Sequence, residues 1–263
     1  MFIRDKENKL LQIDNYRVVE KLGSGGFGIV YKVVDIRDST KIYALKLLHN
    51  IANANRVKQQ LNVLSLLNSS EFFLKIYLSK KVGTKLFLLF EYASGLNLEK
   101  SVRSNILTEI EASKVLLDML DSLEFLHINK IIHNDVKAEN ILKKDDRYYL
   151  IDYDVIKKGS PSKVLHIQGD DDFSAPEIYK GEQSYASDIY SLGCTLYYLL
   201  SGVHVYSFNA DTDFSQKMFA HLYQLPKKDK NISLKMFNII KMMTEKKVEN
   251  RATIQDIRGA LNE

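Results

Sequence analysis

The sequence predicts an α+β fold in which a small β-rich lobe precedes a larger helical lobe. Residues 16–46 and 86–92 are rich in β-branched and aromatic residues, which favour strands. From Thr108 onward, apolar residues recur every three or four positions, which is typical of amphipathic helices. Both patterns stop at residues 93–97, where we expect a hinge. We therefore predict one domain with an N-terminal extension (residues 1–15), a β-rich N-lobe (residues 16–92) and a helical C-lobe (residues 93–263).

A glycine-rich turn, Gly23-Ser24-Gly25-Gly26-Phe27-Gly28, stands between the first two predicted strands. In a dinucleotide site such glycines open a helix, but here they open the strand-forming run from Ile29 to Val34. We therefore predict a hairpin whose backbone N–H groups can approach a phosphate. An ordinary glycine hairpin is the alternative.

A single lysine interrupts the third predicted strand, because Lys46 is the one charged residue between Ile42 and Leu48. Such a lysine either extends to the edge of the sheet or meets an anion. Residues 53–67 then show the apolar spacing of a helix, and Gln60 lies on or beside the apolar face.

The helical lobe is predicted to start at Thr108, which has the capping-box spacing with Glu111, and its first helix reaches Leu126. The run from Ile189 to Ala210 carries no Asp, Glu, Lys or Arg and is long enough to be tested as a membrane span. Its serines, glycines and histidine favour a buried core helix instead. Further predictions are a strand at 148–151, a polar surface loop at 157–172, and helices near 216–222, 233–243 and 254–261.

Composition narrows the class of protein. The 37 basic and 33 acidic residues are spread without long basic blocks, so nucleic acid is not an expected partner. Cys194 is the only cysteine, which excludes an internal disulfide and a cysteine zinc cage, and we expect it to be buried. Residues 1–15 lack the apolar stretch of a signal peptide, so we expect a cytoplasmic protein without a membrane segment. The oligomeric state stays open.

The stretch from His133 to Asn140 gathers polar side chains of four chemical kinds between two apolar runs. Within it, Asp135, Lys137 and Asn140 supply a carboxylate, an ammonium group and an amide that can bind a metal. A second carboxylate, Asp152, follows the strand predicted at 148–151. Groups of these kinds carry out phosphoryl transfer.

With these motifs in order, the chain from about Tyr16 to Leu261 resembles the protein kinase family, and within it the eukaryotic-like (Hanks-type) serine/threonine class. The stretch from His133 to Asn140 is similar to the catalytic loop H-R-D-x-x-x-x-N, and Asp152 is similar to the Asp of D-F-G. Ala175-Pro176-Glu177 matches A-P-E, the peptide platform. The resemblance implies the bilobal fold of that family.

The resemblance also implies roles for the matched residues. Asp135 would accept the proton of the substrate hydroxyl, and Lys137 would stabilise the transferring group. Asn140 and Asp152 would bind Mg²⁺ or Mn²⁺. ATP would be bound by Leu22, Gly23, Gly25, Gly28, Val30, Ala44, Lys46, Phe90, Glu91, Ala93 and Leu142. Structural or regulatory positions would be Gln60, His133, Glu177, Asp188 and Arg251, with Arg251 paired to Glu177.

The implied activity is transfer of the γ-phosphoryl group of ATP to a serine or threonine hydroxyl of a protein. Small-molecule kinases of the aminoglycoside and choline type share the catalytic core. Lys137, the Ala175-Pro176-Glu177 platform and Arg251 favour a protein substrate, and Lys137 resembles serine/threonine rather than tyrosine kinases.

Several positions depart from the family pattern. Gln60 stands about where the family has the glutamate that pairs with the strand lysine, Asp154 replaces the glycine of D-F-G, and Asp170 replaces a threonine. Together they favour an alternative, a nucleotide-binding pseudokinase that acts as a scaffold or allosteric partner. Asn134 replaces the arginine that receives a loop phosphate, so we expect activity without loop phosphorylation. The acidic run Asp170-Asp171-Asp172 predicts substrates with basic residues near the acceptor, a solvated turn being the alternative.

Overall fold

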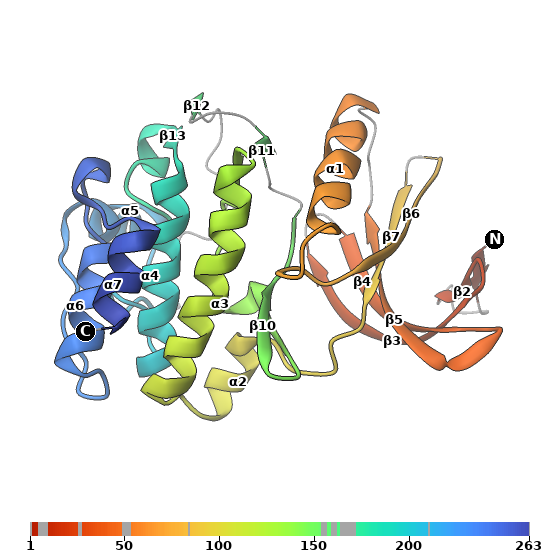
Figure 1. The fold of residues 1–263 in the computed structure, drawn as a ribbon, viewed down its shortest axis with the longest axis horizontal. Coiled ribbons are helices and arrows are strands. Elements are labelled where there is room, and N and C mark those ends of the chain that lie inside the picture. The colour runs from red at the N-terminus through yellow and green to blue at the C-terminus, as the bar shows by residue number, and fades with distance from the viewer. Residues whose placement is uncertain are drawn as a thin grey trace. The chain divides into compact units, whose positions relative to one another are not determined.

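The computed structural model describes residues 2–4, 10–25, 28–48, 54–83, 85–153, 157–158, 162–163, 172–209 and 211–262. The chain divides into two compact units, Met1–Ser94 and Gly95–Glu263 (Figure 1). A β-sheet dominates the first unit and α-helices dominate the second, so the predicted α+β class is confirmed.

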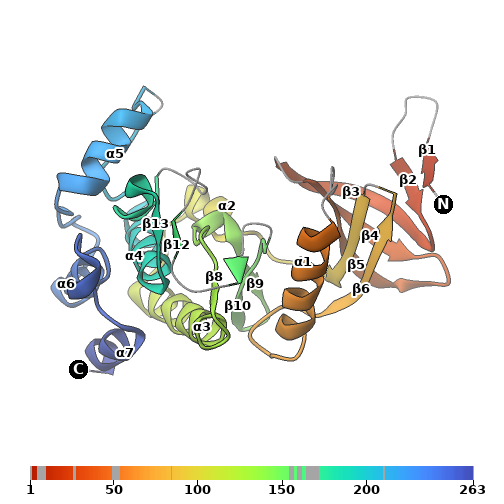
Figure 2. The same ribbon diagram turned by 90° about the horizontal axis from the view of Figure 1, so that it is seen from above.

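The first unit is an antiparallel seven-stranded sheet with the strand order β1-β2-β3-β4-β5-β7-β6. Helix α1 lies beside this sheet and contacts β6 (Figure 2). The elements of the first unit are β1 (Phe2–Arg4), β2 (Leu10–Ile13), β3 (Tyr16–Gly25), β4 (Gly28–Asp35), β5 (Asp38–Leu48), α1 (Ala54–Leu67), β6 (Ile76–Val82) and β7 (Lys85–Glu91). Strands β1 and β2 continue the sheet through β3, so described parts of residues 1–15 belong to the same sheet as the lobe.

One face of this sheet carries the core of the first unit. Val33, Leu45, Leu47 and Phe87 are buried there, with Tyr31 and Tyr43 packed against them. Successive residues of a strand point to opposite faces, so the neighbours of these residues in β4 and β5 share the other face. The alternation therefore separates a packing face from a second face available to other roles.

The second unit is mainly helical. Its helices are α2 (Leu98–Ser104), α3 (Glu109–Ile128), α4 (Tyr185–Ser201), α5 (Phe214–Tyr223), α6 (Leu234–Met243) and α7 (Ile254–Asn262). Its strands pair two by two: β8 (Ile131–Ile132) with β11 (Lys157–Lys158), β9 (Ile141–Lys144) with β10 (Arg147–Leu150), and β12 (Ser162–Lys163) with β13 (Glu182–Gln183). Three short 3₁₀ turns are Ala138–Asn140, Ile178–Lys180 and Val248–Asn250.

Helix α3 begins as predicted. The Thr108 backbone N–H donates to Glu111 Oε2 at 2.9 Å, and the Glu111 N–H donates to Thr108 Oγ1 at 3.3 Å, which closes the capping box. Residues 93–97, predicted as a hinge, include Asn97, whose side chain caps the start of α2 by accepting from the Lys100 N–H. Capping satisfies backbone donors that a helix start leaves without partners.

Helix α4 is the buried centre of the second unit and packs against α3 and α6. Every residue from Ser187 to Leu200 is buried, which confirms the prediction of a core helix, and Cys194 lies among them. The predicted end at Ala210 was wrong, because Gly202 adopts φ 77° and ends the helix after Ser201. Among the described residues, no helix combines the length and apolar character that crossing a membrane requires.

Candidate active site

Asp188 in the first turn of α4 holds the loop that follows β8. Its carboxylate accepts hydrogen bonds from the backbone N–H groups of His133 at 3.0 Å and Asn134 at 2.9 Å. His127 Nε2 lies 2.8 Å from the same carboxylate. Since Asp188 is 1% exposed, these bonds form away from water and fix the loop to the core helix.

His133 is fully buried beneath the loop. Its Nδ1 accepts from the Asp135 N–H at 3.3 Å, and its ring meets the Tyr153 ring edge-on at 6.2 Å. Burial lowers the pKa of His133, which favours the neutral imidazole that an accepting Nδ1 requires. His133 therefore connects the loop to Tyr153, the residue after Asp152, through ring packing and not through an ion pair.

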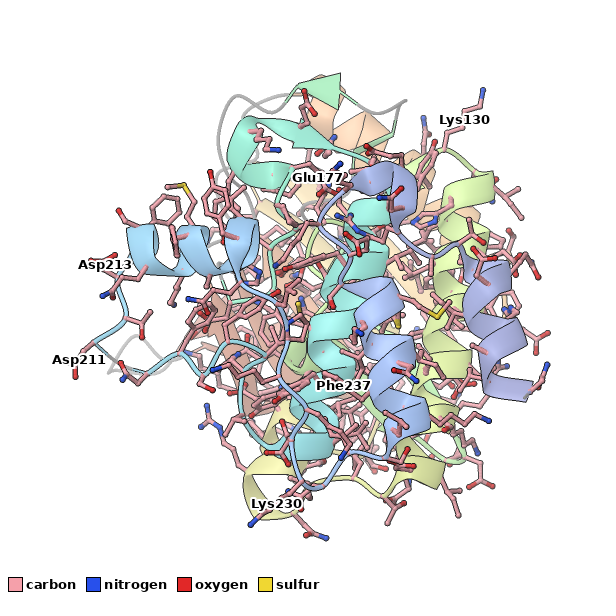
Figure 3. All side chains as sticks on the ribbon, turned by 90° about the vertical axis from the view of Figure 1, so that its left-hand side faces the viewer. Lys130, Glu177, Asp211, Asp213, Lys230 and Phe237 are labelled. Atoms are coloured by element: carbon pink, nitrogen blue, oxygen red, sulfur yellow. The ribbon has the colours of Figure 1, made fainter. Side chains whose placement is uncertain are left out.

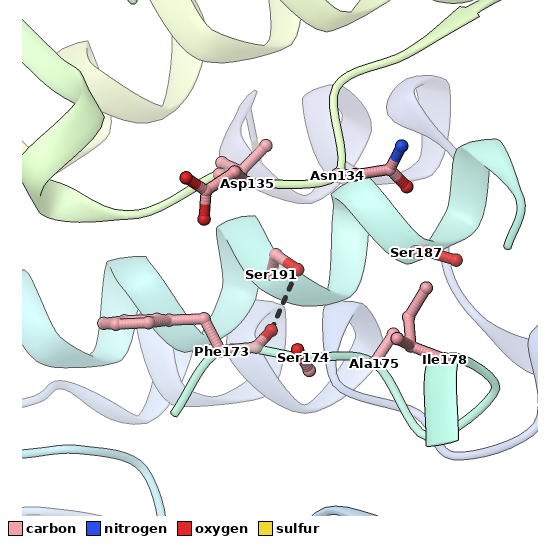
Figure 4. A pocket seen from close by; sticks show the side chains of 9 residues that line it. Asn134, Asp135, Phe173, Ser174, Ala175, Ile178, Ser187 and Ser191 are labelled. Carbon is pink, nitrogen blue, oxygen red and sulfur yellow. Dashed lines mark hydrogen bonds between the residues drawn. The ribbon is translucent and has the colours of Figure 1, made fainter. Parts of the chain in front are cut away.

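Asn134 turns the backbone between the histidine and Asp135. It adopts φ 67°, a left-handed conformation that asparagine tolerates better than most side chains. Among the described residues, neither amide atom of its buried side chain has a hydrogen-bond partner. Asn134 and Asp135 line a small hollow that is closed on its other side by Phe173, Ser174 and Ala175 (Figure 4).

Asp135, Lys137 and Asn140 form one polar group. Asn140 Nδ2 donates to Asp135 Oδ2 at 2.8 Å and to the Asp135 carbonyl at 2.9 Å. Lys137 Nζ lies 3.4 Å from Asp135 Oδ1 and 3.3 Å from Glu139 Oε2. The Asp135 carboxylate is thus oriented on one oxygen by an amide and on the other by a cation. The side chains of Asp135 and Lys137 are 13% and 15% exposed, so a substrate can still reach them.

Sequence reasoning did not single out Glu139. A hydrogen bond with Glu99, followed by burial, raises the pKa of the Glu139 carboxyl. Two carboxyl groups that lie beside each other ionise less readily than one alone, because their negative charges repel. Glu99 lies in α2, 40 residues away in the chain, and no local pattern signals the pair.

The β9–β10 hairpin brings Asn140 and Asp152 to the same end of two strands. Asn140 directly precedes β9, Leu150 pairs with Ile141, and the Ile151 N–H donates to the Asn140 carbonyl at 2.8 Å. Asp152 follows with φ 69°. Leu142, expected to contact the nucleotide, is half-buried in β9.

The side chains at this end of the hairpin suit a divalent cation. With Nδ2 of Asn140 committed to Asp135, its Oδ1 is the atom able to face a metal. An amide oxygen and a carboxylate are hard ligands that Mg²⁺ accepts, usually together with substrate phosphates. In the described part of the chain, no cluster of three His, Cys, Asp or Glu side chains could hold a metal ion. Asp154 lies outside the described residues.

A buried ion pair holds the segment with the A-P-E sequence. Arg251 Nη1 lies 2.6 Å from Glu177 Oε1, and Nη2 lies 3.0 Å from Oε2. Ser187 Oγ, near the start of α4, donates to Glu177 Oε1 at 2.7 Å. We call residues 173–177 the platform. Ser191 Oγ donates to the Phe173 carbonyl at 2.8 Å, so α4 holds the platform near both of its ends (Figure 4).

In the first unit, the strand register places the predicted nucleotide residues on one face. Val30 pairs with Lys46, and Ala44 pairs with Phe90. Because Ala44 and Lys46 are two residues apart on β5, their side chains share the face opposite Leu45 and Leu47. Four residues from three strands are thereby gathered on one surface.

Gly28 closes the glycine-rich turn at a point where two backbones nearly touch. A Cβ at Gly28 would lie 2.3 Å from the Leu47 carbonyl oxygen, whereas a Cβ at Gly23 would meet no atom within 4 Å. Leu22, Gly23 and Gly25 end β3 before the undescribed residues 26 and 27.

The remaining predicted residues of this unit lie at the end of β7 and in α1. Glu91 ends β7, and Ala93 follows it, buried. Gln60 lies in α1, but its side chain is outside the described part of the structure, so a pairing with Lys46 stays a prediction.

A curled antiparallel sheet in the first unit and a helical second unit that carries the Asp135 loop are the parts of a protein kinase fold. Residues 16–260 match the family described as protein kinase domain, and the chain belongs to that family. ATP binding and use of a divalent metal are general properties of its members.

Curated relatives are protein kinases by name, and two of the three described here are named serine/threonine-protein kinases. The chain is 29% identical to the sucrose non-fermenting protein kinase 1 of Fusarium virguliforme, over 94% of this chain and 36% of that protein. It is 27% identical to the probable serine/threonine-protein kinase MARK-C of Dictyostelium discoideum, over 97% of this chain and 34% of that protein. It is 30% identical to the serine/threonine-protein kinase D of Synechocystis, over 78% of this chain and 44% of that protein. The chain thus spans less than half the length of these relatives.

Proposed function

We propose that this protein is an active serine/threonine kinase that transfers the γ-phosphoryl group of ATP to a protein hydroxyl. The observation that carries the proposal is the orientation of the Asp135 carboxylate, which Asn140 holds at 2.8 Å and Lys137 approaches at 3.4 Å. A carboxylate fixed on both sides can align a hydroxyl without reorganising during the reaction.

The residues of the second unit would carry out the phosphoryl transfer, each with its own role. The substrate hydroxyl oxygen bonds to the γ-phosphorus, the bond from that phosphorus to the bridging oxygen of ADP breaks, and the hydroxyl proton passes to Asp135. Lys137, beside Asp135, offsets negative charge on the transferring oxygens. Asn140 and Asp152 would hold Mg²⁺ or Mn²⁺, which neutralises phosphate charge when bound.

The residues of the first unit would bind the nucleotide. Lys46 would contact the α- and β-phosphates, and the backbone N–H groups of the glycine-rich turn would approach them. Val30, Ala44 and Phe90 share the face of Lys46, which suits them to pack against the adenine. Backbone groups at Glu91 to Ala93 would hydrogen-bond the adenine edge.

Protein hydroxyls are the substrate class that the platform favours. The Glu177–Arg251 pair anchors a surface beside Asp135 that a peptide can lie on, and two of the relatives described above are named serine/threonine-protein kinases. A preference for basic residues near the acceptor belongs to the same proposal. Asp172 already lies 2.6 Å from Lys217, so that preference would depend on Asp170 and Asp171, which are outside the described residues.

The direct test is phosphoryl transfer from γ-labelled ATP to a complex lysate and to generic serine and threonine peptides. The wild type should label protein, and Asp135→Ala should lower the rate by about 10³-fold or more because alignment and proton acceptance are both lost. Asp211→Ala, a change at an exposed aspartate of the same unit, serves as the matched control and should retain activity. Absence of transfer to any acceptor would contradict the proposal and favour a nucleotide-binding scaffold.

A further inference from the structure

A charged contact outside the catalytic loop holds the N-terminal end of the platform. Asp172 directly precedes the platform, and its Oδ1 lies 2.6 Å from Lys217 Nζ on α5. His204, in the loop after α4, places Nε2 3.6 Å from Asp172 Oδ2. The side chains of Asp172 and Lys217 are 20% and 21% exposed, so their pairing is less screened than that of a surface pair.

Aromatic rings fix the geometry of this contact. The His204 ring stacks on Tyr198 of α4 at 5.3 Å and meets the edge of Phe173, the first platform residue, also at 5.3 Å. Lys217 Nζ lies over the Phe208 ring at 5.8 Å from its centre. Rings packed in this way restrict the side chains that approach Asp172.

Helix α5 is itself fastened to the core, so it can serve as an anchor. Lys246 Nζ donates to the His221 carbonyl at 2.7 Å and contacts Tyr206 Oη at 2.5 Å. A cation at the carbonyl end of a helix is favourable because those carbonyls lack partners within the helix. This attachment lies in the last turn of α5, whereas the helix starts next to Asp213, which lies at the left edge of the view in Figure 3.

On the side of the catalytic loop, Asn134 lines the hollow beside the platform. Asn134, which stands where the family resemblance places an arginine, is neutral. A phosphate bound there would meet no cation from Asn134. Lys217 of α5 supplies a charged contact at the N-terminal end of the platform.

We propose that Asp172, Lys217 and His204 form a clamp that positions the platform from the α5 side, so that protein substrates bind without a phosphorylated loop residue. The proposal rests on the proposed kinase function and names a positioning device for it. In this proposal the Asp172 carboxylate binds Lys217 and His204 of the same chain and does not bind the substrate.

Charge reversal tests the clamp in the full chain. Asp172→Lys and Lys217→Asp each place like charges together, and the double variant restores opposite charges. Hydrogen exchange of amides in residues 173–181 should speed up by about tenfold in each single variant and return toward the wild-type rate in the double variant. Lys228→Met is the control, because Lys228 is an exposed lysine that donates to the Asp229 carbonyl in another part of this unit. If a reversed variant unfolds, Lys217→Met removes the charge while keeping the length of the side chain.

Kinetics adds a second readout. In the single variants the KM for a protein substrate should rise about fivefold or more, while the KM for ATP and kcat stay near wild type. Unchanged exchange of the platform in both single variants, or a double variant as fast as the singles, would overturn the clamp. Altered exchange with an unchanged KM for protein would overturn its role in substrate binding. If the wild type transfers no phosphate, the kinase proposal fails, and the exchange result alone decides whether α5 holds the platform.

Discussion

Gly28 is the position of the glycine-rich turn with the least room around it. Its hydrogen atoms face the Leu47 carbonyl, where a Cβ would come within 2.3 Å, so any side chain must push β4 and β5 apart. Gly23, five residues earlier, has open space around it. The surroundings of the two glycines therefore differ, and only the position of the neighbouring strand β5 shows that Gly28 has no room for a side chain.

Gly28→Ala should lower the free energy of unfolding by about 1–3 kcal/mol, because two strands must separate to admit the methyl group. Gly23→Ala is the matched control and should change it by roughly 0.5 kcal/mol or less. Urea unfolding of both variants measures the difference. Equal losses in the two variants would show that β4 and β5 do not approach as closely at Gly28 as described.

Lys246 is a half-buried cation among aromatic hydroxyls and backbone carbonyls. Besides its hydrogen bonds, its Nζ lies 4.5 Å from the centre of the Tyr206 ring. Burial lowers the pKa of Lys246 to about 8 from its ordinary value of 10.5. The folded protein therefore releases this proton at a lower pH than the unfolded chain does.

This pKa shift predicts how stability depends on pH. Between about pH 8 and 10.5 the unfolded chain binds more protons at Lys246, so its contribution to the free energy of unfolding rises with pH. The slope is at most about 1.4 kcal/mol per pH unit, less for the part of the side chain that water reaches. Urea unfolding of wild type and Lys246→Met across this window should give a difference that grows with pH. A difference independent of pH would refute the shift.

The ion pair between the platform and the segment after α6 fastens elements that are distant in sequence. Arg251 is 5% exposed and holds Glu177 with two nitrogens, while Ser187 of α4 donates to the same carboxylate. A buried pair stabilises little relative to apolar residues, but removing one partner leaves a charge without compensation. The pair thus makes the position of the platform dependent on both α4 and α6.

Arg251→Met should cost about 3–5 kcal/mol of unfolding free energy, because Glu177 would remain buried as a carboxylate without its cation. The double variant Glu177→Gln with Arg251→Met should lose less, since no isolated charge remains. Arg251→Lys keeps the charge but not the two-pronged geometry, and should fall between wild type and Arg251→Met. A double variant less stable than Arg251→Met would contradict this account of the pair.

For the whole chain, a measurement of Mg-ATP binding can distinguish the ability to bind the nucleotide from the ability to transfer its phosphoryl group. A ligand that binds only the folded state stabilises it by about 2.7 kcal/mol at a hundredfold excess over its Kd. Wild type and Asp135→Ala should both show a rise in Tm with Mg-ATP, whereas only the wild type transfers phosphate. Chelating the metal, or Asp152→Asn, should reduce the rise. No stabilisation of the wild type would leave only a scaffold role.

The local patterns of the sequence were sufficient for the class of fold and for most elements. The Thr108–Glu111 capping box, the strands flanking the glycine-rich turn and the helices near 216–222, 233–243 and 254–261 follow from residues close together in the chain. The order of the kinase motifs predicted the family, which the match over residues 16–260 shows.

What the sequence alone determined was the family and the candidate residues for the chemistry, because Asp135, Lys137 and Asn140 lie within six residues of one another in the order of the kinase motif. Only the tertiary structure decided how that loop and the platform are held. Asp188 contacts a loop more than 50 residues earlier, and Asp172 meets Lys217 of a later helix. Contacts of this kind form when packing brings distant segments together, and the spacing of residues along a chain carries no record of them.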